Sequence, residues 1–590
     1  MRRPRHAVGT VLAVLMALLV TTGCAGLPAD GPVQTEQIQA QIEDEAPVDF
    51  TPGGPEPGAA PVEVVRGFLI AMQATPINTS VARRFLTTES SQSWVPEEGT
   101  TVYESETRSS RGSRVRLDLN DVVQIDGRGR WLGKKGDRRH YLQMVREDGQ
   151  WRIDNPPDRL IIPATHFETR FTQYFLYFFD KAAQVLVPEP VYVPTGAQAS
   201  TFLVAGLLAG PDRDLLGVER TFIPARTRLD DISVPVTLDG VVDVPLSDEI
   251  LDVDDERLSL AFAQLAWTLR QVPGTERLRV TVDGSPLDLP GPGTDLSVTG
   301  WSEFDPAVSW ASQSLFGIRE GRVVTLVGDK ERRVSGPFGS LDLRPRRIAV
   351  DLPGEQVAAT TDDGTVLVAP RTRDVGTDPG LDDVRRVYSG GTDLLAPVWD
   401  SYGQLWVLDR TAEGAALSVV KSGFARPLVA AGITGEDVRS LLLSRDGTRL
   451  VAEVARGERE RLVLARVQRD PDGGVRRVLP AGPVRLGGLD VRTIRDVAWR
   501  TPGSLALLTA PSPGNSQVVV VKVDGSSTAA ESTTDAEIFS GVARELVTSP
   551  ALGAPLYIRS PGGQMFALAV NGRWTGAGIR AGIRSPTFVG

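Results

Sequence analysis

Cysteine and histidine are nearly absent from this sequence of 590 residues. Cys24 is the only cysteine, and His140 and His166 are the only histidines beyond the first few residues. One thiol excludes an intrachain disulfide and a cysteine-rich zinc site, and two distant histidines do not make a zinc-binding motif. The chain also lacks the G-x-S-x-G turn of many serine nucleophiles. We therefore expect no catalytic residue, no metal and no cofactor. A carboxylate pair of the glycosidase type stays an open alternative, because acidic residues are plentiful.

Long basic runs are missing as well. The net charge is −10 at pH 7, and no stretch carries enough lysine and arginine to neutralise many phosphates, so we expect no nucleic-acid partner. Hydrophobic residues make up 41% of the chain and charged residues 23%, which is ordinary for folded protein and excludes wholesale disorder. At roughly 150 residues per domain, this length predicts about three or four domains.

The start of the chain predicts an export signal, a lipid attachment site and a tether. Arginines precede an apolar run, 7–20, that is too short for a stop-transfer helix and is typical of a signal peptide. The small residues before Cys24 resemble a bacterial lipobox, although leucine is usual where this chain has Thr21. That resemblance implies a lipoprotein signal peptide at 1–23 and a diacylglycerol on the Cys24 thiol. Residues 24–60 are polar, acidic and rich in proline and glycine, which predicts a flexible tether.

Residues 61–165 predict a small α+β domain with a cone-like, curled antiparallel sheet. Apolar residues from Val64 to Met72 recur on one face of a helix that begins at Pro61, a permitted first-turn position for proline. A second short helix is expected near 80–86. Strand-like segments follow at 115–125, 139–145 and 151–153, with a hairpin turn at Asp148-Gly149.

Residues 170–292 predict a second α+β domain with a recognisable order of segments. An aromatic strand from Phe171 comes first, then LVPEPVYVP, LLAGP, FIPARTRLDDISV, TLDGVVDVPLS and a long helix. Strands separated by turns are expected across 219–247, with a hairpin turn at Asp239-Gly240. This order resembles a GerMN domain, a module of sporulation and cell-envelope proteins. In that family the module is associated with protein–protein assembly, so the resemblance implies docking rather than chemistry.

Four clustered acids allow a calcium site before the long helix of this domain. They are Asp252, Asp254, Asp255 and Glu256. The cluster lacks the alternating ligands and the glycine of a calcium loop. Acids in the first turn of a helix complement its dipole without a metal, and this is the interpretation we favour.

A repeated pattern fills residues 300–590. Two glycine-containing turns, about ten residues apart and flanked by apolar strand-like segments, recur at intervals of about 50 residues. The first turns hold Gly354, Gly403, Gly447, Gly503 and Gly553, and the second turns hold Gly364, Gly414, Gly457, Gly514 and Gly563. A weaker copy precedes them with Gly321 at its second turn. With a looser fourth segment, this pattern predicts a β-propeller of about six blades, with the arginine pairs of 331–334, 384–387 and 475–478 on solvated outer strands.

Together these features resemble the actinobacterial lipoprotein LpqB family across nearly the whole chain. The resemblance implies a protein that is not an enzyme, lipid-anchored at the extracytoplasmic face of the cell membrane. It also implies that the protein binds the extracellular domain of the sensor histidine kinase of the Mtr two-component system, with effects on envelope homeostasis and cell division. The rival hypothesis is an envelope protein whose propeller binds a glycan or a peptide, or hydrolyses a glycan. The sequence names no small ligand.

Overall fold

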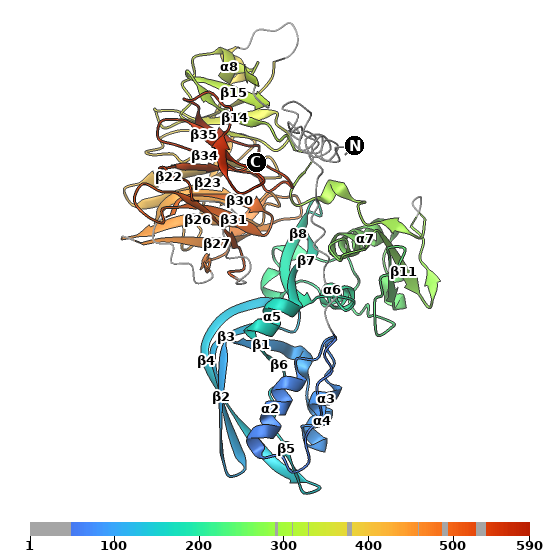
Figure 1. Ribbon diagram of the computed structural model, residues 1–590. Helices are drawn as coiled ribbons and strands as arrows, with labels where there is room; N and C mark the ends of the chain where they lie inside the picture. The colour runs from blue at the N-terminus through green and yellow to red at the C-terminus, as the bar shows by residue number, and fades with distance from the viewer. Residues whose placement is uncertain are drawn as a thin grey trace, which may run out of the picture. The chain divides into compact units, whose positions relative to one another are not determined.

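The N-terminal domain packs short helices against a curled sheet (Figure 1). The computed structural model describes residues 49–289, 293–309, 311–327, 330–373, 380–457, 459–486, 494–526 and 538–590. The strand order of the sheet is β5-β4-β3-β1-β6, and β2 also pairs with β3. The helices are α2 (Pro61–Ala71), α3 (Ser80–Arg83), α4 (Thr88–Ser93), the 3₁₀ turn η1 (Pro96–Glu98) and α5 (Ala164–Arg170); the strands are β1 (Gly99–Tyr103), β2 (Ser105–Arg111), β3 (Arg114–Asp126), β4 (Trp131–Glu147), β5 (Gln150–Ile153) and β6 (Leu160–Pro163).

One strand pair of this sheet differs from the wholly antiparallel arrangement that the sequence predicts. β1 pairs with β6 in parallel, with Thr100 beside Leu160. The reason is the path of the chain, since β5 and β6 lie at opposite ends of the strand order and the chain crosses over between them. A crossover brings the strand back in the same direction as its neighbour, whereas a hairpin reverses it.

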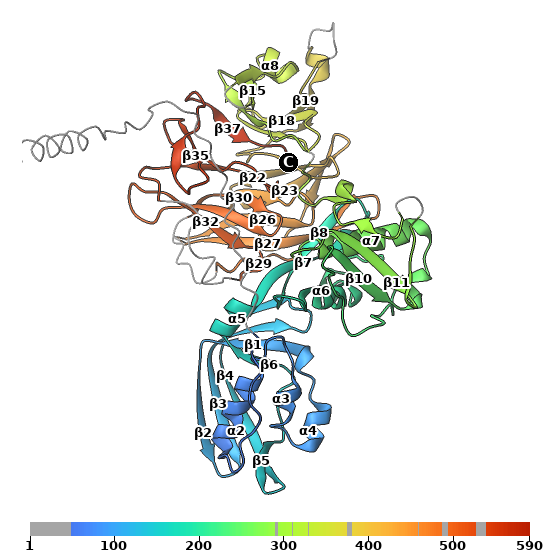
Figure 2. The same ribbon diagram turned by 45° about the vertical axis from the view of Figure 1, so that its right-hand side comes forward.

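The second domain contains two small sheets and two helices, which Figure 2 brings forward. The aromatic strand β7 lies between β8 and β9, antiparallel to both. In the other sheet β10 and β11 are parallel, and β12 and β13 are antiparallel to β11. The elements are β7 (Phe171–Asp180), β8 (Leu186–Pro194), α6 (Ala199–Leu208), η2 (Arg213–Leu215), β9 (Glu219–Arg220), β10 (Val241–Leu246), η3 (Asp248–Leu251), α7 (Asp255–Leu269), β11 (Arg277–Val282), β12 (Ser285–Pro286), β13 (Leu296–Ser297) and η4 (Ser302–Phe304).

The strands expected across 219–247 form only in part. β9 and β10 are present, and the turn at Asp239-Gly240 is closed by a hydrogen bond from the Thr237 N–H to the Val241 carbonyl at 2.8 Å. The segment between them makes only isolated bridges. Pro224 and Pro235 lie in this segment, and proline cannot donate to a strand ladder.

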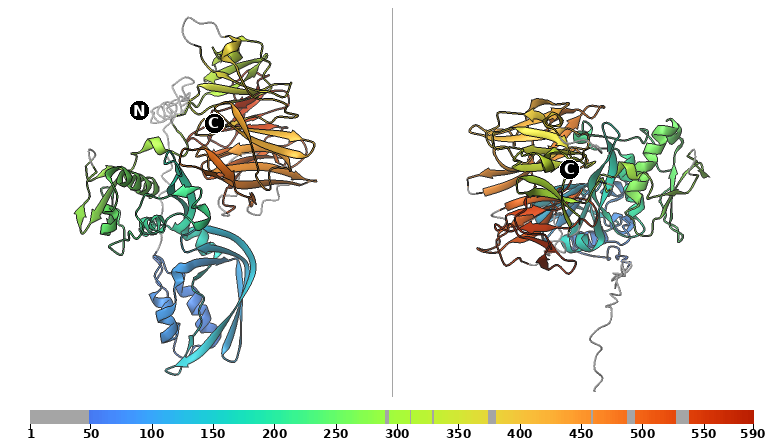
Figure 3. Two further views of the ribbon diagram at one scale, coloured as in Figure 1. Left: turned by 180° about the vertical axis from the view of Figure 1, so that it is seen from behind. Right: turned by 90° about the horizontal axis from the view of Figure 1, so that it is seen from above.

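Six sheets follow one another as the blades of a propeller (Figure 3). Written from the innermost strand outwards, their orders are β37-β14-β15-β16, β17-β18-β19-β20, β21-β22-β23-β24, β25-β26-β27-β28, β30-β31-β32 and β33-β34-β35-β36, with β29 also on β27. The first three blades contain β14 (Leu315–Arg319), β15 (Arg322–Val327), β16 (Lys330–Arg333), α8 (Pro337–Ser340), β17 (Arg347–Val350), β18 (Gln356–Thr360), β19 (Val366–Pro370), η5 (Leu381–Asp383), β20 (Arg385–Tyr388), β21 (Val398–Trp399), β22 (Leu405–Thr411), β23 (Gly414–Lys421) and β24 (Phe424–Leu428). The others contain β25 (Asp437–Leu443), β26 (Arg449–Arg456), β27 (Arg459–Arg469), β28 (Val475–Val478), β29 (Gly482–Pro483), β30 (Ile494–Thr501), β31 (Ser504–Thr509), β32 (Gln517–Lys522), β33 (Glu545–Val547), β34 (Tyr557–Arg559), β35 (Met565–Leu568), β36 (Trp574–Gly576) and β37 (Arg584–Thr587).

The propeller prediction is therefore confirmed, and each glycine pair lies where the blade turns. Gly354 lies between the first and second strands of its blade, and Gly364 lies between the second and third. At Gly364 the backbone has φ +73°, and a β-carbon there would lie 2.0 Å from the Gly391 carbonyl oxygen. A side chain at Gly364 would thus be excluded by strain and by contact. The positive φ is shared by the glycines of all the second turns, which explains why glycine recurs there.

The first blade takes its innermost strand from the far end of the chain. β37 pairs antiparallel with β14, so the weak copy around Gly321 supplies only the three outer strands of that blade. A buried cluster that includes Leu315, Val547, Met565 and Phe588 joins the last blade to the first. This arrangement closes the ring, because the two ends of the propeller share one sheet.

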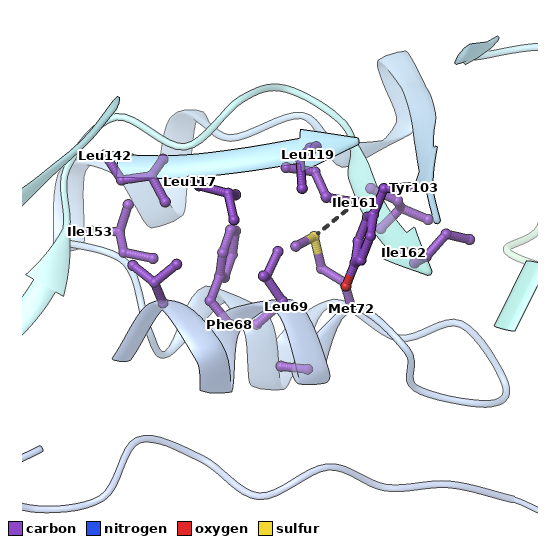
Figure 4. Close-up of a cluster of buried hydrophobic side chains, with 14 of the residues drawn as sticks. Phe68, Leu69, Met72, Tyr103, Leu117, Leu119, Leu142, Ile153, Ile161 and Ile162 are labelled. Atoms are coloured by element: carbon purple, nitrogen blue, oxygen red, sulfur yellow. Dashed lines mark hydrogen bonds between the residues drawn. The ribbon is translucent and has the colours of Figure 1, made fainter. Parts of the chain in front are cut away.

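The apolar face of α2 lies against the sheet of the N-terminal domain, as the sequence predicts (Figure 4). Phe68, Leu69 and Met72 are at most 2% exposed and face Leu117 and other sheet residues. The Met72 sulfur also accepts a hydrogen bond from a backbone N–H of β6 at 3.3 Å. Burial of each such side chain stabilises the domain by about 1.5–3 kcal/mol.

Candidate functional site: a buried charge cluster and the propeller channel

The residues that the sequence singles out do not converge on one site. Cys24, the signal peptide 1–23 and most of the tether lie outside the described residues. Within the described part of the chain, no helix has the length and apolar character needed to cross a membrane. His140 lies in β4 and His166 in α5. Burial lowers the pKa of both imidazoles. For His166 the positive charge of Arg170 adds to the effect of burial, and its pKa is about 4.

The acidic cluster before the long helix has a structural role. Asp254 is the N-cap of α7 and accepts a hydrogen bond from the Arg257 backbone N–H at 2.9 Å. Such a cap satisfies one of the free N–H groups of the first helical turn. Among the described residues, no group of three or more histidine, cysteine, aspartate or glutamate side chains is placed to hold a metal ion.

A buried cluster of charged side chains joins the GerMN-like domain to the propeller. Arg449, at the start of β26, is 0% exposed as a residue. Its guanidinium is 2.7 Å from the Glu189 carboxylate of β8 and 3.0 Å from Asp446 in the preceding turn. It also donates to the backbone carbonyl of Pro188. Arg466 of β27 reaches the same Glu189 carboxylate at 2.8 Å. Glu189 therefore links β8 to two neighbouring strands of one blade.

The two acidic side chains that β8 and β9 contribute to this cluster have pKa values that are shifted in opposite directions. Burial opposes ionisation of Glu189, but Arg466 and Arg449 hold its pKa down at about 2. Glu219 of β9 is also fully buried, and burial together with the nearby Glu189 carboxylate raises its pKa well above the usual range. Arg466 also lies 3.7 Å from the Glu219 carboxyl, so the two arginines are shared among the three acidic side chains Glu189, Glu219 and Asp446. A buried charge that loses its partner is costly, and the cluster therefore depends on both arginines.

Further polar contacts extend this interface over neighbouring blades. The Tyr402 hydroxyl donates to Asp180 of β7, and Arg469 lies 4.6 Å from the centre of the Tyr402 ring. The Tyr192 hydroxyl of β8 is 2.5 Å from the Ser526 hydroxyl. In the same region Gln173 of β7 donates to a carboxylate of the fifth blade at 2.9 Å. Strands β7 and β8 therefore contact the propeller in addition to forming part of their own sheet.

The propeller encloses a channel with a cavity of about 630 Å³. Residues of all six innermost strands line it, and the two carboxylates among the lining residues are Asp496 and Glu545. Asp496 accepts hydrogen bonds from the backbone N–H groups of Leu546 and Val497, at 2.7 and 2.9 Å. Glu545 pairs with Arg559 through both of its oxygens. Each carboxylate is thus engaged by its own structural partners.

Asp496 gives a prediction for pH dependence. Burial raises its pKa to about 7, against the two backbone hydrogen bonds, and the charges of Glu545 and Glu453 add to the rise. Between about pH 4 and pH 7 the native carboxyl therefore holds a proton that the unfolded chain has lost. The raised native pKa of Asp496 contributes its full amount to the free energy of unfolding below about pH 4, and this contribution declines as the pH rises from about 4 to about 7. We expect Asp496→Asn to make that decline shallower in thermal unfolding between pH 4 and 8.

The decline is reduced rather than abolished, because burial also raises the pKa of Glu453 to about 7 and this residue remains in the variant. Parallel pH profiles for the two proteins would contradict the prediction.

Sequence reasoning did not find the charge cluster. Arg449 and Glu189 are 260 residues apart, and no motif connects them. The local sign of this cluster in the sequence is that Arg449 and Arg466 lie in segments that the repeat predicts as apolar strands. The predicted outer-strand arginine pairs, by contrast, do lie on the outermost strands β16, β20 and β28.

Comparison with known proteins gives the same three domains. The model of the lipoprotein LpqB N-terminal domain matches residues 54–168, the model described as sporulation and spore germination matches 175–288, and the lipoprotein LpqB beta-propeller domain matches 321–565. The chain is 28% identical to Lipoprotein LpqB of Thermobifida fusca, over 92% of each chain. It is 28% identical to that of Cutibacterium acnes, over 89% of this chain and 90% of the relative, and 29% identical to that of Mycolicibacterium smegmatis, over 88% of each.

Two solved structures are also similar in part. The first GerMN domain of the sporulation protein GerM from Bacillus subtilis is 24% identical, over 21% of this chain and 97% of that chain, with a TM-score of 0.18. TolB from Acinetobacter baumannii is 10% identical, over 58% of this chain and 86% of that chain, with a TM-score of 0.33.

The fold defines a multidomain propeller protein in which a GerMN-like domain docks on the blades through buried polar contacts. The family models and the relatives identify it further. The chain belongs to the LpqB lipoprotein family.

Proposed function

We propose that this protein is a lipoprotein of the extracytoplasmic membrane face that binds the extracellular domain of the Mtr sensor kinase and modulates its phosphorelay. The observation that carries the proposal is the LpqB domain set, shared with relatives over about nine-tenths of their length. A lipid anchor at Cys24 would bring the protein to the membrane that holds such a kinase. Two partners confined to one membrane surface meet at a raised effective concentration without any new contact.

The folded domains support a binding role. The charge cluster around Glu189 and the contacts of Tyr192 and Tyr402 join the GerMN-like domain to several blades. A partner that contacts either domain would therefore also act on the other. The two channel carboxylates, Asp496 and Glu545, are held by structural partners, which favours binding over glycan hydrolysis.

Co-purification tests this proposal. The full chain, purified in detergent, is expected to retain the extracellular domain of the kinase on an affinity column, while the extracellular domain of an unrelated sensor kinase passes through. Absence of retention, together with turnover of an envelope glycan that Glu545→Gln abolishes, would replace the proposal with the hydrolase hypothesis. Retention of both kinase domains to the same extent would show that the binding is not specific and would also contradict it.

A further inference from the structure

Five of the six blades carry an arginine at the same place in the innermost strand. Each lies within three residues of the start of that strand, one residue before or just inside it. Most follow one pattern, in which an apolar residue precedes the arginine and an apolar residue comes two positions after it, as in Val438-Arg439-Ser440-Leu441 and Ile494-Arg495-Asp496-Val497. The five are Arg346, Arg439, Arg495, Arg544 and Arg584.

Arg439 and Arg495 each lie at a register shift of the innermost strand, whereas Arg346 and Arg544 donate a backbone N–H to a carbonyl of the second strand. In the fourth blade Leu441 pairs with Ala452, and in the fifth Val497 pairs with Leu507. The third blade has Leu395 at this position, where its N–H donates to the Leu408 carbonyl at 3.0 Å. The residue two places earlier is Asp393, and it forms an ion pair with Arg410 of the neighbouring strand. In the third blade the arginine that lines the cavity is therefore Arg410 of the second strand, and not a residue of the innermost strand.

The arginines gather at one end of the channel. In the second to sixth blades the innermost strand runs from this position towards the first turn, and the chain after β37 runs parallel to β17, with Val589 bridged to Val350. The GerMN-like domain contacts the other end, because Tyr402 lies in a first turn, Arg449 directly follows one, and Lys522 ends a strand there. The arginine end of the channel is therefore the end that points away from that contact.

Positive charge dominates the lining of the cavity. In the lining the five arginines are joined by Arg347, Arg410 and Arg559, against the two carboxylates Asp496 and Glu545. Arg445 also lines the cavity, but it lies in the first turn of the fourth blade and donates to the carbonyls of Ala307 and Val589. Arg346, Arg439, Arg544 and Arg584 are exposed. Several of these arginines have partners: Arg559 pairs with Glu545, Arg410 with Asp393, Arg439 with Asp437 and Arg346 with Asp362, and Arg495 donates to the Ser516 hydroxyl and the Ala543 carbonyl. Arg544 and Arg584 have no ion pair among the described residues, and Arg346 and Arg439 share exposed pairs that a ligand carboxylate can compete for. This local excess contrasts with the net charge of −10 of the whole chain.

Below the arginines, the lining of the cavity offers contacts for the apolar side chains and the backbone of a ligand. Leu441, Val497 and Trp499 line the cavity below the arginines. The indole N–H of Trp499 is buried and has no hydrogen-bond partner among the described residues. Each innermost strand ends the strand order of its sheet, so its second edge faces the channel. Some groups of these edges already have partners, since the Ile348 N–H donates to the Ser585 hydroxyl at 3.1 Å and the Leu546 N–H donates to Asp496 at 2.7 Å.

We propose that this end of the channel binds an acidic peptide segment. Its carboxylates would contact the arginine ring, by which we mean Arg346, Arg439, Arg495, Arg544 and Arg584, and its apolar side chains and backbone would lie in the cavity. Arginine presents a planar fork that matches a carboxylate in two hydrogen bonds. A phosphate polymer would satisfy the ring but would leave the apolar lining and the strand edges unused, whereas an acidic peptide fits all three. This inference goes beyond the proposed kinase contact and does not require it.

Fluorescence anisotropy with a defined probe tests the proposal. The probe is a short fluorescein-labelled peptide of alternating aspartate and leucine, and the protein is the full chain in detergent. We expect saturable binding that weakens as NaCl is raised, since the contacts are ionic at the rim. The variant Arg439→Ser/Arg544→Ser/Arg584→Ser should bind about tenfold more weakly or worse. A matched control, Arg385→Ser/Arg386→Ser/Arg476→Ser, removes the same charge from the exposed outermost strands β20 and β28 and should bind as the unmodified chain does.

Other outcomes overturn the proposal. Equal loss in the two triple variants would reduce the effect to net charge, and no loss in the ring variant would place the peptide elsewhere. Tighter binding of inorganic polyphosphate than of the peptide, lost in the ring variant, would assign the ring to a phosphate ligand instead. The salt dependence and the competition by polyphosphate are measured on the unmodified chain, so these two measurements test the ionic peptide contact even if the ring variant does not fold.

Discussion

Replacing Cys24 with serine is expected to move the protein from the membrane fraction to the soluble fraction. Serine keeps the size of the side chain but removes the thiol that would carry diacylglycerol. Each buried methylene of an acyl chain contributes about 0.8 kcal/mol, and two chains are needed for firm anchoring, so loss of the modification should abolish retention rather than weaken it. The measurement is partition between the detergent and aqueous phases, followed by mass spectrometry of the mature N-terminus.

Thr21 supplies the matched control for this experiment. Thr21→Leu restores the residue that is usual in a lipobox, so this variant should partition with lipid at least as well as the unmodified chain. If the Cys24→Ser protein still enters the detergent phase with an acyl mass attached, the lipid site lies elsewhere and the prediction for Cys24 is wrong.

Replacing Arg449 with methionine is expected to lower the free energy of unfolding by about 3–5 kcal/mol, the range typical when one partner of a buried ion pair is removed. Methionine has a similar length but no charge, so it would leave Glu189 and Asp446 buried without their shared cation. The carbonyl of Pro188 would lose its donor as well. The change is read from the denaturant midpoint in guanidinium unfolding of the full chain, followed by tryptophan fluorescence.

The same strand provides a control. Arg456, at the other end of β26, pairs with Glu436 at 2.8 Å, but its side chain is 58% exposed. Exposed pairs contribute at most about 1 kcal/mol, so Arg456→Met should shift the midpoint little. Equal shifts for the two variants would show that burial of the Glu189 cluster adds nothing to stability.

Local pattern was enough to predict most elements of the fold. The apolar stripe of α2 and its start at Pro61 follow from helical periodicity and from the fixed φ of proline, and the structure confirms both. The glycine pairs predicted the blade turns, because positions such as Gly364 require a backbone conformation and a space that only glycine provides. These features depend on neighbours in sequence, and so the sequence displays them.

Features that depend on distant pairing were missed. The parallel pair β1–β6 requires knowledge of where the chain crosses the sheet. The return of β37 to the first blade requires closure of the ring, and the short strand around Arg584 gives no sign of its partner. The arginines of the channel are scattered along the sequence at blade intervals, and only the register places them around one opening.

By itself, the sequence determined the domain order and the repeated blade, since both are written in local periodicity and turn residues. It also predicts an export signal at the lone cysteine from local composition. Only the tertiary structure decided which charges meet. Glu189 and Arg449 are compatible with many solvated positions until folding buries them together, and burial removes the water that would otherwise satisfy each charge alone. Contacts of that kind carry no local signal, because their energy depends on an environment that the whole fold creates.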